Sequence, residues 1–213
     1  MRYTARVGKR PSSRRWLQEH RADPYVKQAR AEGYRSRAAF KLQQLDHRYG
    51  LLQPGSVVVD LGASPGGWSQ WSVQRVGPKG KVYALDVLPL QGITGVTFVQ
   101  GDFREESVRR SLLDAVGERG VDLLLSDMAP NLSGVAAVDQ ARAIELGGLA
   151  LDLAVMCLRR GGAMLVKVFQ GEGLEDYLRE VRRHFRSLER SKPESSRARS
   201  RELYVLARGF GGV

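Results

Sequence analysis

The chain has 213 residues, of which 42% are hydrophobic and 27% are charged, values typical of a single soluble globular domain. The 34 Lys and Arg residues exceed the 23 Asp and Glu residues, which gives a net charge of +11. No apolar stretch is long enough to span a membrane, and no apolar signal core opens the chain. The single cysteine, Cys157, excludes an internal disulfide and has no metal-ligand spacing with the three histidines. We therefore expect a monomeric, cytoplasmic protein without a metal.

The positive charge is concentrated at the two ends of the chain. Residues 1–41 have a net charge of +9 and residues 182–201 a net charge of +6, whereas residues 42–181 have a net charge of −4. Such polarisation is typical of proteins that bind a polyanion. A membrane surface would also attract these ends, but the sequence has no long amphipathic basic helix with aromatic anchors. We expect no membrane partner.

The N-terminal segment is basic and polar and lacks a sustained hydrophobic period. We interpret residues 1–30 as a flexible or loosely docked arm ahead of one domain over residues 31–213. A helix is predicted to follow the arm, capped by Ser36 and ended by Gly50.

Beyond this helix, apolar runs of strand length alternate with segments of helical spacing. Strands are predicted at Val57–Leu61, Val82–Leu85, Val96–Val99, Leu123–Ser126 and Ala163–Phe169. Helices are predicted at about 67–76, 105–117, 138–159 and 173–184, with a loop at 86–95. The third of these helices is expected to end at Arg159-Arg160-Gly161, because cations followed by glycine are a common helix stop. The alternation predicts an α/β fold with a mostly parallel sheet covered by helices on both faces. Two last runs, near Ser187–Ser191 and Glu202–Ala207, predict an antiparallel hairpin at the sheet edge.

A glycine-rich loop, DLGASPGGW, follows the first predicted strand and opens a helix. Glycines let backbone N–H groups approach a ligand closely, and a helix N-terminus favours negative charge. The spacing is not the G-x-G-x-x-G of dinucleotide-binding loops and a proline lies inside it, which weakens an NAD interpretation. By itself, the loop is equally compatible with a tight strand-to-helix turn that binds nothing.

Acidic residues lie at the ends of three consecutive strands. Asp60 opens the glycine loop, Asp86 closes the second strand, and Asp102 follows the third. In a parallel sheet these positions share the carboxyl edge, where ligands bind and where a carboxylate can hold ribose hydroxyls or a base amino group. A single such Asp is often only a helix cap, but three of them suit a cationic ligand. S-adenosyl-L-methionine, adenosine joined to an amino acid through a sulfonium, is such a ligand.

Two further charged residues occupy unusual positions. Asp127 follows the fourth strand in SDMAPN, and Lys167 lies inside the apolar fifth strand. Lysine is rarely buried without a partner. Lys167 is therefore either an edge-strand side chain that reaches water, or a lysine held beside carboxylates with its pKa lowered by desolvation.

Seven strings over residues 12–208 resemble the FtsJ/RrmJ family of ribosomal RNA 2′-O-ribose methyltransferases, its bacterial large-subunit type in particular. They are SSRRWLQEH, YRSRAAFKL, DLGASPGGWSQ, QGDFRE, SDMAPNLSG, VKVFQGEG and KPESSRARSRELY. The resemblance implies a Rossmann-like methyltransferase fold, S-adenosyl-L-methionine as cofactor, and a Lys-Asp-Lys-Glu catalytic tetrad at Lys41, Asp127, Lys167 and Glu202. It also implies cofactor contacts at Gly66, Trp68, Asp86, Asp102 and Asp127. Ser64 departs from the alanine common in this loop, and the first ten residues match nothing.

The implied reaction explains these residue types. A ribose 2′-hydroxyl must lose its proton during methyl transfer, and a general base contributes about 10²- to 10⁴-fold in rate. Lysine is a base only when neutral, so its pKa would have to fall from about 10.4 to about 7–8. Positioning contributes roughly 7–11 kcal/mol and should outweigh the base. We expect Lys167 to take the proton, Asp127 to orient it, Lys41 to position the ribose, and Glu202 to fix the lysines or the hydroxyl.

The arginines beside the tetrad suit an RNA backbone, since guanidinium groups pair well with phosphates. They are Arg35, Arg37, Arg197, Arg199 and Arg201. The resemblance implies that the substrate is a uridine in the A loop of 23S ribosomal RNA, within the assembled 50S subunit. Three alternatives stay open: a 2′-O-methyltransferase for transfer RNA or an mRNA cap, a non-catalytic RNA-binding assembly factor, and an NAD-dependent oxidoreductase.

Overall fold

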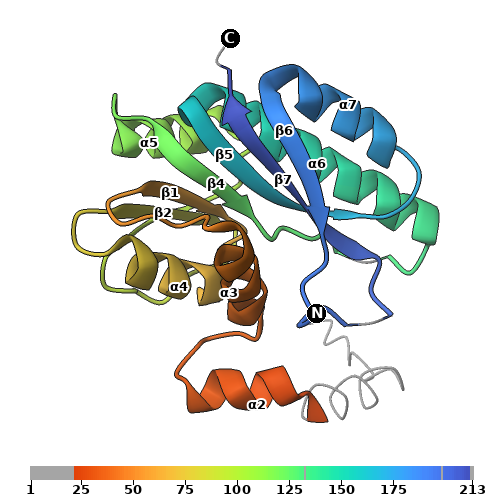
Figure 1. The fold of residues 1–213 in the computed structure, drawn as a ribbon, viewed down its shortest axis with the longest axis horizontal. Helices are drawn as coiled ribbons and strands as arrows, with labels where there is room; N and C mark the ends of the chain where they lie inside the picture. The colour runs from red at the N-terminus through yellow and green to blue at the C-terminus, as the bar shows by residue number, and fades with distance from the viewer. Residues whose placement is uncertain (1–21, 132, 198, 212–213) are drawn as a thin grey trace, which may run out of the picture.

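The computed structural model describes residues 22–131, 133–197 and 199–211. Within them, seven strands form one sheet in the order β3-β2-β1-β4-β5-β7-β6 (Figure 1). The strands are β1 Val57–Leu61, β2 Lys81–Asp86, β3 Val96–Gln100, β4 Val121–Ser126, β5 Leu158–Phe169, β6 Phe185–Ser191 and β7 Glu202–Phe210. The first five run parallel, and β7 pairs antiparallel with both β5 and β6. The predicted α/β fold with an antiparallel C-terminal pair is confirmed, with β6 at the edge and β7 inside.

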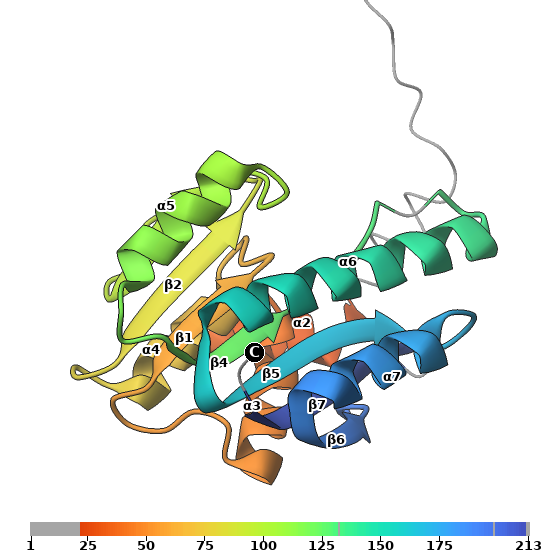
Figure 2. The ribbon, with the colours of Figure 1, turned by 90° about the horizontal axis from the view of Figure 1, so that it is seen from above.

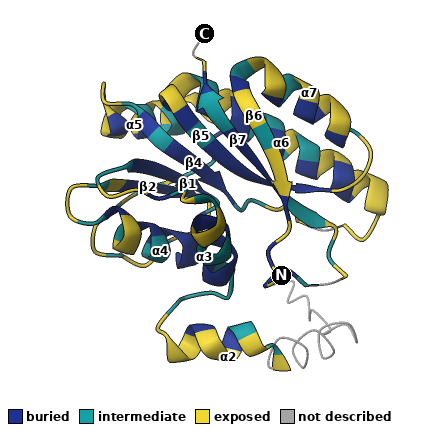
Figure 3. Ribbon diagram, in the orientation of Figure 1, coloured by how far each residue is buried: buried dark blue, intermediate teal, exposed yellow. Residues whose placement is uncertain are grey.

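Helices cover both faces of the sheet (Figure 2). They are α2 Pro24–Ala31, α3 Ala38–Tyr49, α4 Gly67–Val76, α5 Glu106–Val116, α6 Ala136–Cys157 and α7 Leu174–His184. The apolar side chains form two clusters, one between the sheet and α5, α6 and α7, the other between the sheet and α3 and α4. Strand β1 shows why: Val57 and Val59 join the first cluster and Val58 the second, because successive side chains in a strand point to opposite faces. The central strands are therefore buried on both sides (Figure 3).

Two helix ends differ from the sequence prediction. Helix α6 ends at Cys157, and β5 begins at Leu158, which pairs with Val121 of β4 ahead of a register shift in that pair. Arg159 is thus a strand residue, and it forms an ion pair with Asp122. At the start of α3, the predicted cap Ser36 is replaced by Arg37, and no side chain caps the helix.

The N-terminal arm is also more regular than predicted. Residues 24–31 form α2, with Asp23 as its N-cap and Pro24 in its first turn, both common helix-start signals. This helix packs against α3. Residues 1–21 of the expected arm lie outside the described residues. The predicted loop at 86–95 is confirmed over residues 87–95, while Asp86 is the last residue of β2.

No helix of the described chain is both long and apolar enough to cross a membrane.

A buried carboxylate joins the two helices on one face of the sheet. Asp46 of α3 is 1% exposed. It accepts hydrogen bonds from the Leu52 amide at 2.8 Å, from Trp71 Nε1 at 3.2 Å and from Arg75 Nε at 2.9 Å. Trp71 and Arg75 belong to α4, so one side chain sets the position of α3 against the helix that follows the glycine loop.

We predict that Asp46→Ala lowers the free energy of unfolding by about 2–3 kcal/mol, because it leaves buried donors without an acceptor. Urea denaturation measures this change. The control is Glu180→Ala on α7, which removes a half-exposed carboxylate paired with Arg183 and should cost less than about 1 kcal/mol. Equal effects of the two substitutions would contradict the prediction.

Candidate active site

Four charged side chains come from four different elements to one place. Asp127 follows β4, Lys167 lies in β5, Glu202 opens β7, and Lys41 lies in α3. In the β5–β7 pair, Lys167 is opposite Tyr204, two residues beyond Glu202. Residues opposite each other, or two apart on one strand, share a face of the sheet. That face is the one covered by α3, which carries Lys41.

The four side chains form two ion pairs. Lys167 Nζ lies 3.0 Å from Asp127 Oδ1 and donates to the Asp127 carbonyl oxygen at 2.6 Å. Lys41 Nζ lies 3.1 Å from Glu202 Oε2. Lys167 is 7% exposed and its strand is flanked by β4 and β7, so it is not an edge-strand lysine that reaches water. The structure therefore brings the predicted tetrad together and places Lys167 beside a carboxylate.

Tyr204 is a fifth member of the cluster that sequence reasoning missed. Its hydroxyl donates to Asp127 Oδ1 at 2.7 Å, and Lys41 Nζ lies 5.8 Å from its ring centroid. Burial, followed by the Asp127 charge, raises the pKa of Tyr204 well above its usual value, so the phenol stays a donor. The sequence did contain a signal for Tyr204: it lies two residues after Glu202 on a predicted strand, and residues two apart on a strand point to the same face.

These neighbours keep Asp127 ionised. Burial by itself would raise the pKa of this carboxyl, but the charges of Lys167 and Lys41 and the hydrogen bonds from Tyr204 and Lys167 lower it below the usual value. This half-buried carboxylate is therefore a negative charge at neutral pH.

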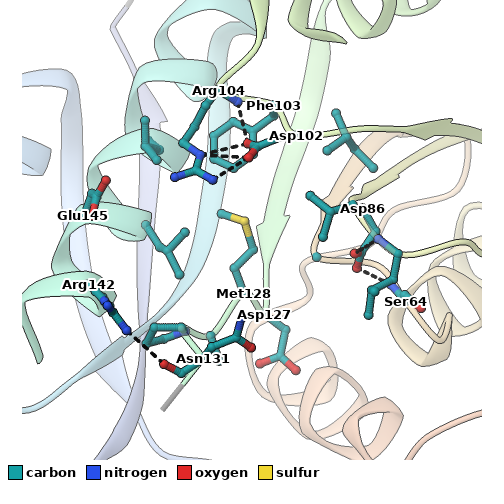
Figure 4. Close-up of a pocket in the computed structure, with 18 of the residues that line it drawn as sticks. Ser64, Asp86, Asp102, Phe103, Arg104, Asp127, Met128, Asn131, Arg142 and Glu145 are labelled. Atoms are coloured by element: carbon teal, nitrogen blue, oxygen red, sulfur yellow. Dashed lines mark hydrogen bonds and ion pairs between the residues drawn. The ribbon is translucent and has the colours of Figure 1, made fainter. Parts of the chain in front are cut away.

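A cavity of about 630 Å³ opens at the carboxyl ends of the strands, next to Asp127 (Figure 4). Four acidic side chains, Asp86, Asp102, Asp127 and Glu145, and two arginines, Arg104 and Arg142, line it, so acidic groups are in excess. Apolar walls come from Leu85, Phe103, Met128 and Leu149. The loop of Met128 packs closely on Gly62, where an added Cβ would lie 2.7 Å from Met128 Cγ. The size, the acidic lining and the apolar walls fit S-adenosyl-L-methionine, which combines a cation with an adenine ring.

Asp86 and Asp102 both have partners within the protein. Asp86 accepts from the backbone amides of Ser64 and Leu88, each at 2.8 Å, and so joins the glycine loop to the loop after β2. Asp102 forms an ion pair of 2.5 Å with Arg104, a lining residue that sequence reasoning did not single out. The Arg104 hydrogen bonds lower the pKa of Asp102. Both carboxylates are thus held at the cavity, and a cofactor contact by either stays a prediction.

Two other predicted cofactor residues do not line this cavity. Gly66 precedes α4 with a left-handed φ of 114°, which explains the glycine. The Trp68 indole is 3% exposed, donates from Nε1 to the Ala38 carbonyl at 2.8 Å and packs 5.8 Å from the Tyr204 ring. The indole belongs to the core between α3 and α4. A cofactor contact by Gly66 or Trp68 stays a prediction.

Asp60 lies behind the glycine loop rather than in the cavity. Its Oδ2 accepts from Ser69 Oγ at 2.6 Å, whereas its buried Oδ1 has no hydrogen-bond partner among the described residues. Burial raises the pKa of Asp60 to about 7, helped by the charges of Asp127 and Asp86 and opposed by Ser69. This carboxyl is consequently half protonated near neutral pH.

A second cavity, of about 420 Å³, adjoins the Lys41–Glu202 pair. The basic residues that line it are Arg37, Lys41, Arg197 and Arg199. Hydrogen bonds join the start of α3 to the segment before β7 here. Arg37 donates to Asp23 and to the Ser195 carbonyl, and Ser195 is bonded to Gln44 of α3 at 2.9 Å. Within the described residues, arginines from both basic segments therefore lie beside the tetrad.

Arg201 and Arg35 do not line this second cavity. Arg201 is exposed directly before Glu202. Arg35 donates instead to backbone carbonyls beside the glycine loop.

Known proteins resemble this chain in both sequence and fold. Residues 34–210 match the family described as FtsJ-like methyltransferase. A curated protein of Alkalilimnicola ehrlichii, "Ribosomal RNA large subunit methyltransferase E", is 57% identical over 95% of this chain and 97% of its own length. The Pseudomonas aeruginosa protein of the same name is 53% identical over 94% of this chain and 97% of its own length.

Among solved structures, a Plasmodium falciparum protein described as a ribosomal RNA methyltransferase has a TM-score of 0.76. It is 28% identical, over 84% of this chain and all of that one. Aeropyrum pernix fibrillarin, solved with S-adenosyl-L-methionine, has a TM-score of 0.58 at 19% identity, over 82% of this chain and 75% of that one. The fibrillarin likeness supports the Rossmann-like fold alone.

We predict that Asp60→Asn changes the pH dependence of stability. The pKa of Asp60 rises from 3.8 to about 7 on folding, so the folded wild type loses stability as pH rises from about 4 to about 7 and then levels off. The Asn variant lacks this loss. Its unfolding free energy relative to wild type should therefore increase by roughly 2–3 kcal/mol between pH 5 and pH 8. Urea titrations at both pH values measure it, and a constant difference would refute the prediction.

Proposed function

Because the chain belongs to the FtsJ-like methyltransferase family, we propose that it methylates the 2′-hydroxyl of a uridine in the A loop of 23S ribosomal RNA. The proposed methyl donor is S-adenosyl-L-methionine and the proposed substrate form is the assembled 50S subunit. The large-subunit substrate is supported by the names of relatives 53–57% identical over nearly the whole chain. We further propose that the protein acts as a monomer in the cytoplasm.

One observation carries this proposal: the tetrad joins the two cavities. Asp127 lines the acidic cavity, while Lys41 and Glu202 line the basic one. Lys167 and Tyr204 both bond to Asp127, and Lys41 lies over the Tyr204 ring. A cationic cofactor and an anionic RNA would therefore meet at this cluster.

The acidic cavity holds the cofactor in this proposal. Asp86 and Asp102 would bind the adenosine part, Asp102 with its position fixed by Arg104. Asp127 would face the charged sulfur, since an ionised, half-buried carboxylate favours a nearby cation. When bound, S-adenosyl-L-methionine would supply a methyl group on a sulfonium.

The tetrad would then prepare the ribose hydroxyl. Lys41, held by Glu202, positions the ribose at the mouth of the basic cavity. Lys167 would first release its own proton to solvent and then, as the neutral amine, take the hydroxyl proton. Asp127 and its carbonyl oxygen fix Lys167 through two contacts. Holding the hydroxyl in place contributes roughly 7–11 kcal/mol, more than the roughly 3–5 kcal/mol of a general base.

The basic cavity would bind the RNA backbone. Arg197 and Arg199 come from the segment before β7, and Arg37 from the start of α3, so phosphates would be bound from two sides. Arg201, exposed beside Glu202, would extend this surface. The substrate nucleotide can be identified by mass spectrometry of RNA after reaction, with isolated 23S RNA and 50S particles compared.

We predict that Lys167→Ala lowers kcat by about 10²- to 10⁴-fold while the Kd for S-adenosylhomocysteine changes less than about threefold. Asp127→Ala should impair both turnover and cofactor binding, because Asp127 also lines the cofactor cavity. Tritium transfer from labelled cofactor to RNA and calorimetry measure the two quantities. Lys81→Ala, an exposed lysine at the start of β2, is the control and should behave as wild type. Near-normal turnover by both tetrad variants would refute the assignment.

We also predict a steep salt dependence of RNA binding. Contact with about six phosphates should weaken affinity roughly 10³-fold between 50 and 200 mM salt. Arg197→Ala should make this slope shallower, since a lining cation of the basic cavity is lost. Arg182→Ala, on α7 at the opposite face of the sheet, should leave it unchanged. Filter binding over a salt series tests both variants. If the affinity of the wild type for RNA did not change with salt, RNA binding by the basic cavity would be excluded.

A further inference from the structure

Arg35 lies between two loops that border the cofactor cavity. The first is the glycine loop, residues 62–66, and the second is the β2–β3 loop, residues 87–95. The Arg35 guanidinium donates to the Pro65 carbonyl of the first loop at 3.4 Å. It donates to the carbonyls of Gln91 and Gly92 in the second loop at 2.5 and 2.8 Å. One side chain thus connects both loops.

The stem of Arg35 also packs against the glycine loop. A Cβ added at Gly66 would lie 3.2 Å from Arg35 Cδ and 2.7 Å from Ile93 Cδ1, so the three residues are in close contact. The Arg35 amide donates to Gln70 Oε1 at 2.8 Å, and Gln70 Nε2 donates to the Gly33 carbonyl at 3.0 Å. The backbone around Arg35 is therefore fixed to α4, the helix that the glycine loop opens.

Asp86 makes the complementary connection from inside the cavity. Its carboxylate accepts from the amide of Ser64 in the glycine loop and from the amide of Leu88 in the β2–β3 loop. Asp86 thus binds N–H groups of both loops, and Arg35 binds C=O groups of both loops. Because the two loops supply lining residues Gly62, Ser64, Val87 and Leu88, their separation sets the width of the cavity at this side.

In these contacts, the two terminal nitrogens of the guanidinium together donate to carbonyls of both loops. Its planar, fixed donors reach carbonyls on two separate loops, a geometry that a lysine ammonium does not reproduce. Three of the five guanidinium N–H donors are committed to carbonyls in this way, which leaves at most two for an RNA phosphate. Arg37, only two residues away, lines the basic cavity, whereas Arg35 does not.

We infer that Arg35 is a positioning residue for the cofactor site: it clamps the glycine loop to the β2–β3 loop and sets cofactor affinity, rather than binding an RNA phosphate. The inference rests on the proposed cofactor. It replaces the sequence-based expectation that Arg35 belongs to the RNA-binding surface.

The test compares Arg35→Ala and Arg35→Lys with Arg201→Ala in the full-length protein. Both Arg35 variants should raise the KM for S-adenosyl-L-methionine and the Kd for S-adenosylhomocysteine about tenfold, through loss of two or three hydrogen bonds. Their kcat at saturating cofactor and the salt slope of RNA binding should stay within twofold of wild type. Arg201→Ala should show the reverse pattern, with weaker RNA binding and normal cofactor affinity.

The lysine variant separates geometry from charge, because it keeps the positive charge and loses the planar guanidinium. Wild-type cofactor affinity in Arg35→Ala, or a shallower RNA salt slope that Arg35→Lys restores, would overturn the inference. Equal losses of kcat, RNA binding and cofactor binding, with a lower melting temperature in both variants, would also overturn it, as they indicate a general folding role. A wild-type protein that does not bind S-adenosylhomocysteine would instead refute the proposed cofactor, and this inference with it.

Discussion

A carboxylate that is largely removed from water needs positive or hydrogen-bonding partners, and this active site depends on the partners that Asp127 finds. Its partners, Lys167 and Tyr204, come from β5 and β7. Tyr204 reaches Asp127 because β7 runs antiparallel beside β5, in the register that sets Tyr204 opposite Lys167. The departure from an all-parallel sheet is therefore a requirement of the site, since it supplies the phenol and the Glu202 carboxylate at the edge where Asp127 lies.

The uneven distribution of charge along the sequence corresponds to an uneven distribution of charge in the structure. The acidic middle of the sequence forms the sheet edge with Asp86, Asp102 and Asp127, where a cation is favoured. Basic residues from both ends, Arg37 and Lys41 of one and Arg197 and Arg199 of the other, line the cavity on the other side of the tetrad. Opposite charges are thus kept in adjacent cavities, with the paired lysines and carboxylates between them, and each ligand would meet a potential of the opposite sign.

Sequence reasoning predicted what depends on local pattern, and the family resemblance supplied the tetrad. Runs such as Val57–Leu61 alternate with helical segments, and that pattern is sufficient for the parallel sheet and the final hairpin. Sequence reasoning failed where the structure depends on pairing between residues that are far apart in the sequence. Arg159 and Gly161 have the local signature of a helix end, but pairing of Leu158 with Val121 extends the strand instead. The contact of Tyr204 with Asp127 likewise depends on register between strands far apart in sequence, which no local pattern contains.

The insertion of β7 between β5 and β6 has a consequence for the order in which the protein is made. Of all the described strands, β7 is the last to be synthesised, and yet it is an inner strand of the sheet. A growing chain on the ribosome can build the glycine loop and the acidic sheet edge early, but it lacks Tyr204 and Glu202 until β7 has emerged. A nascent chain therefore lacks two members of the proposed catalytic cluster until the last of the described strands has been synthesised.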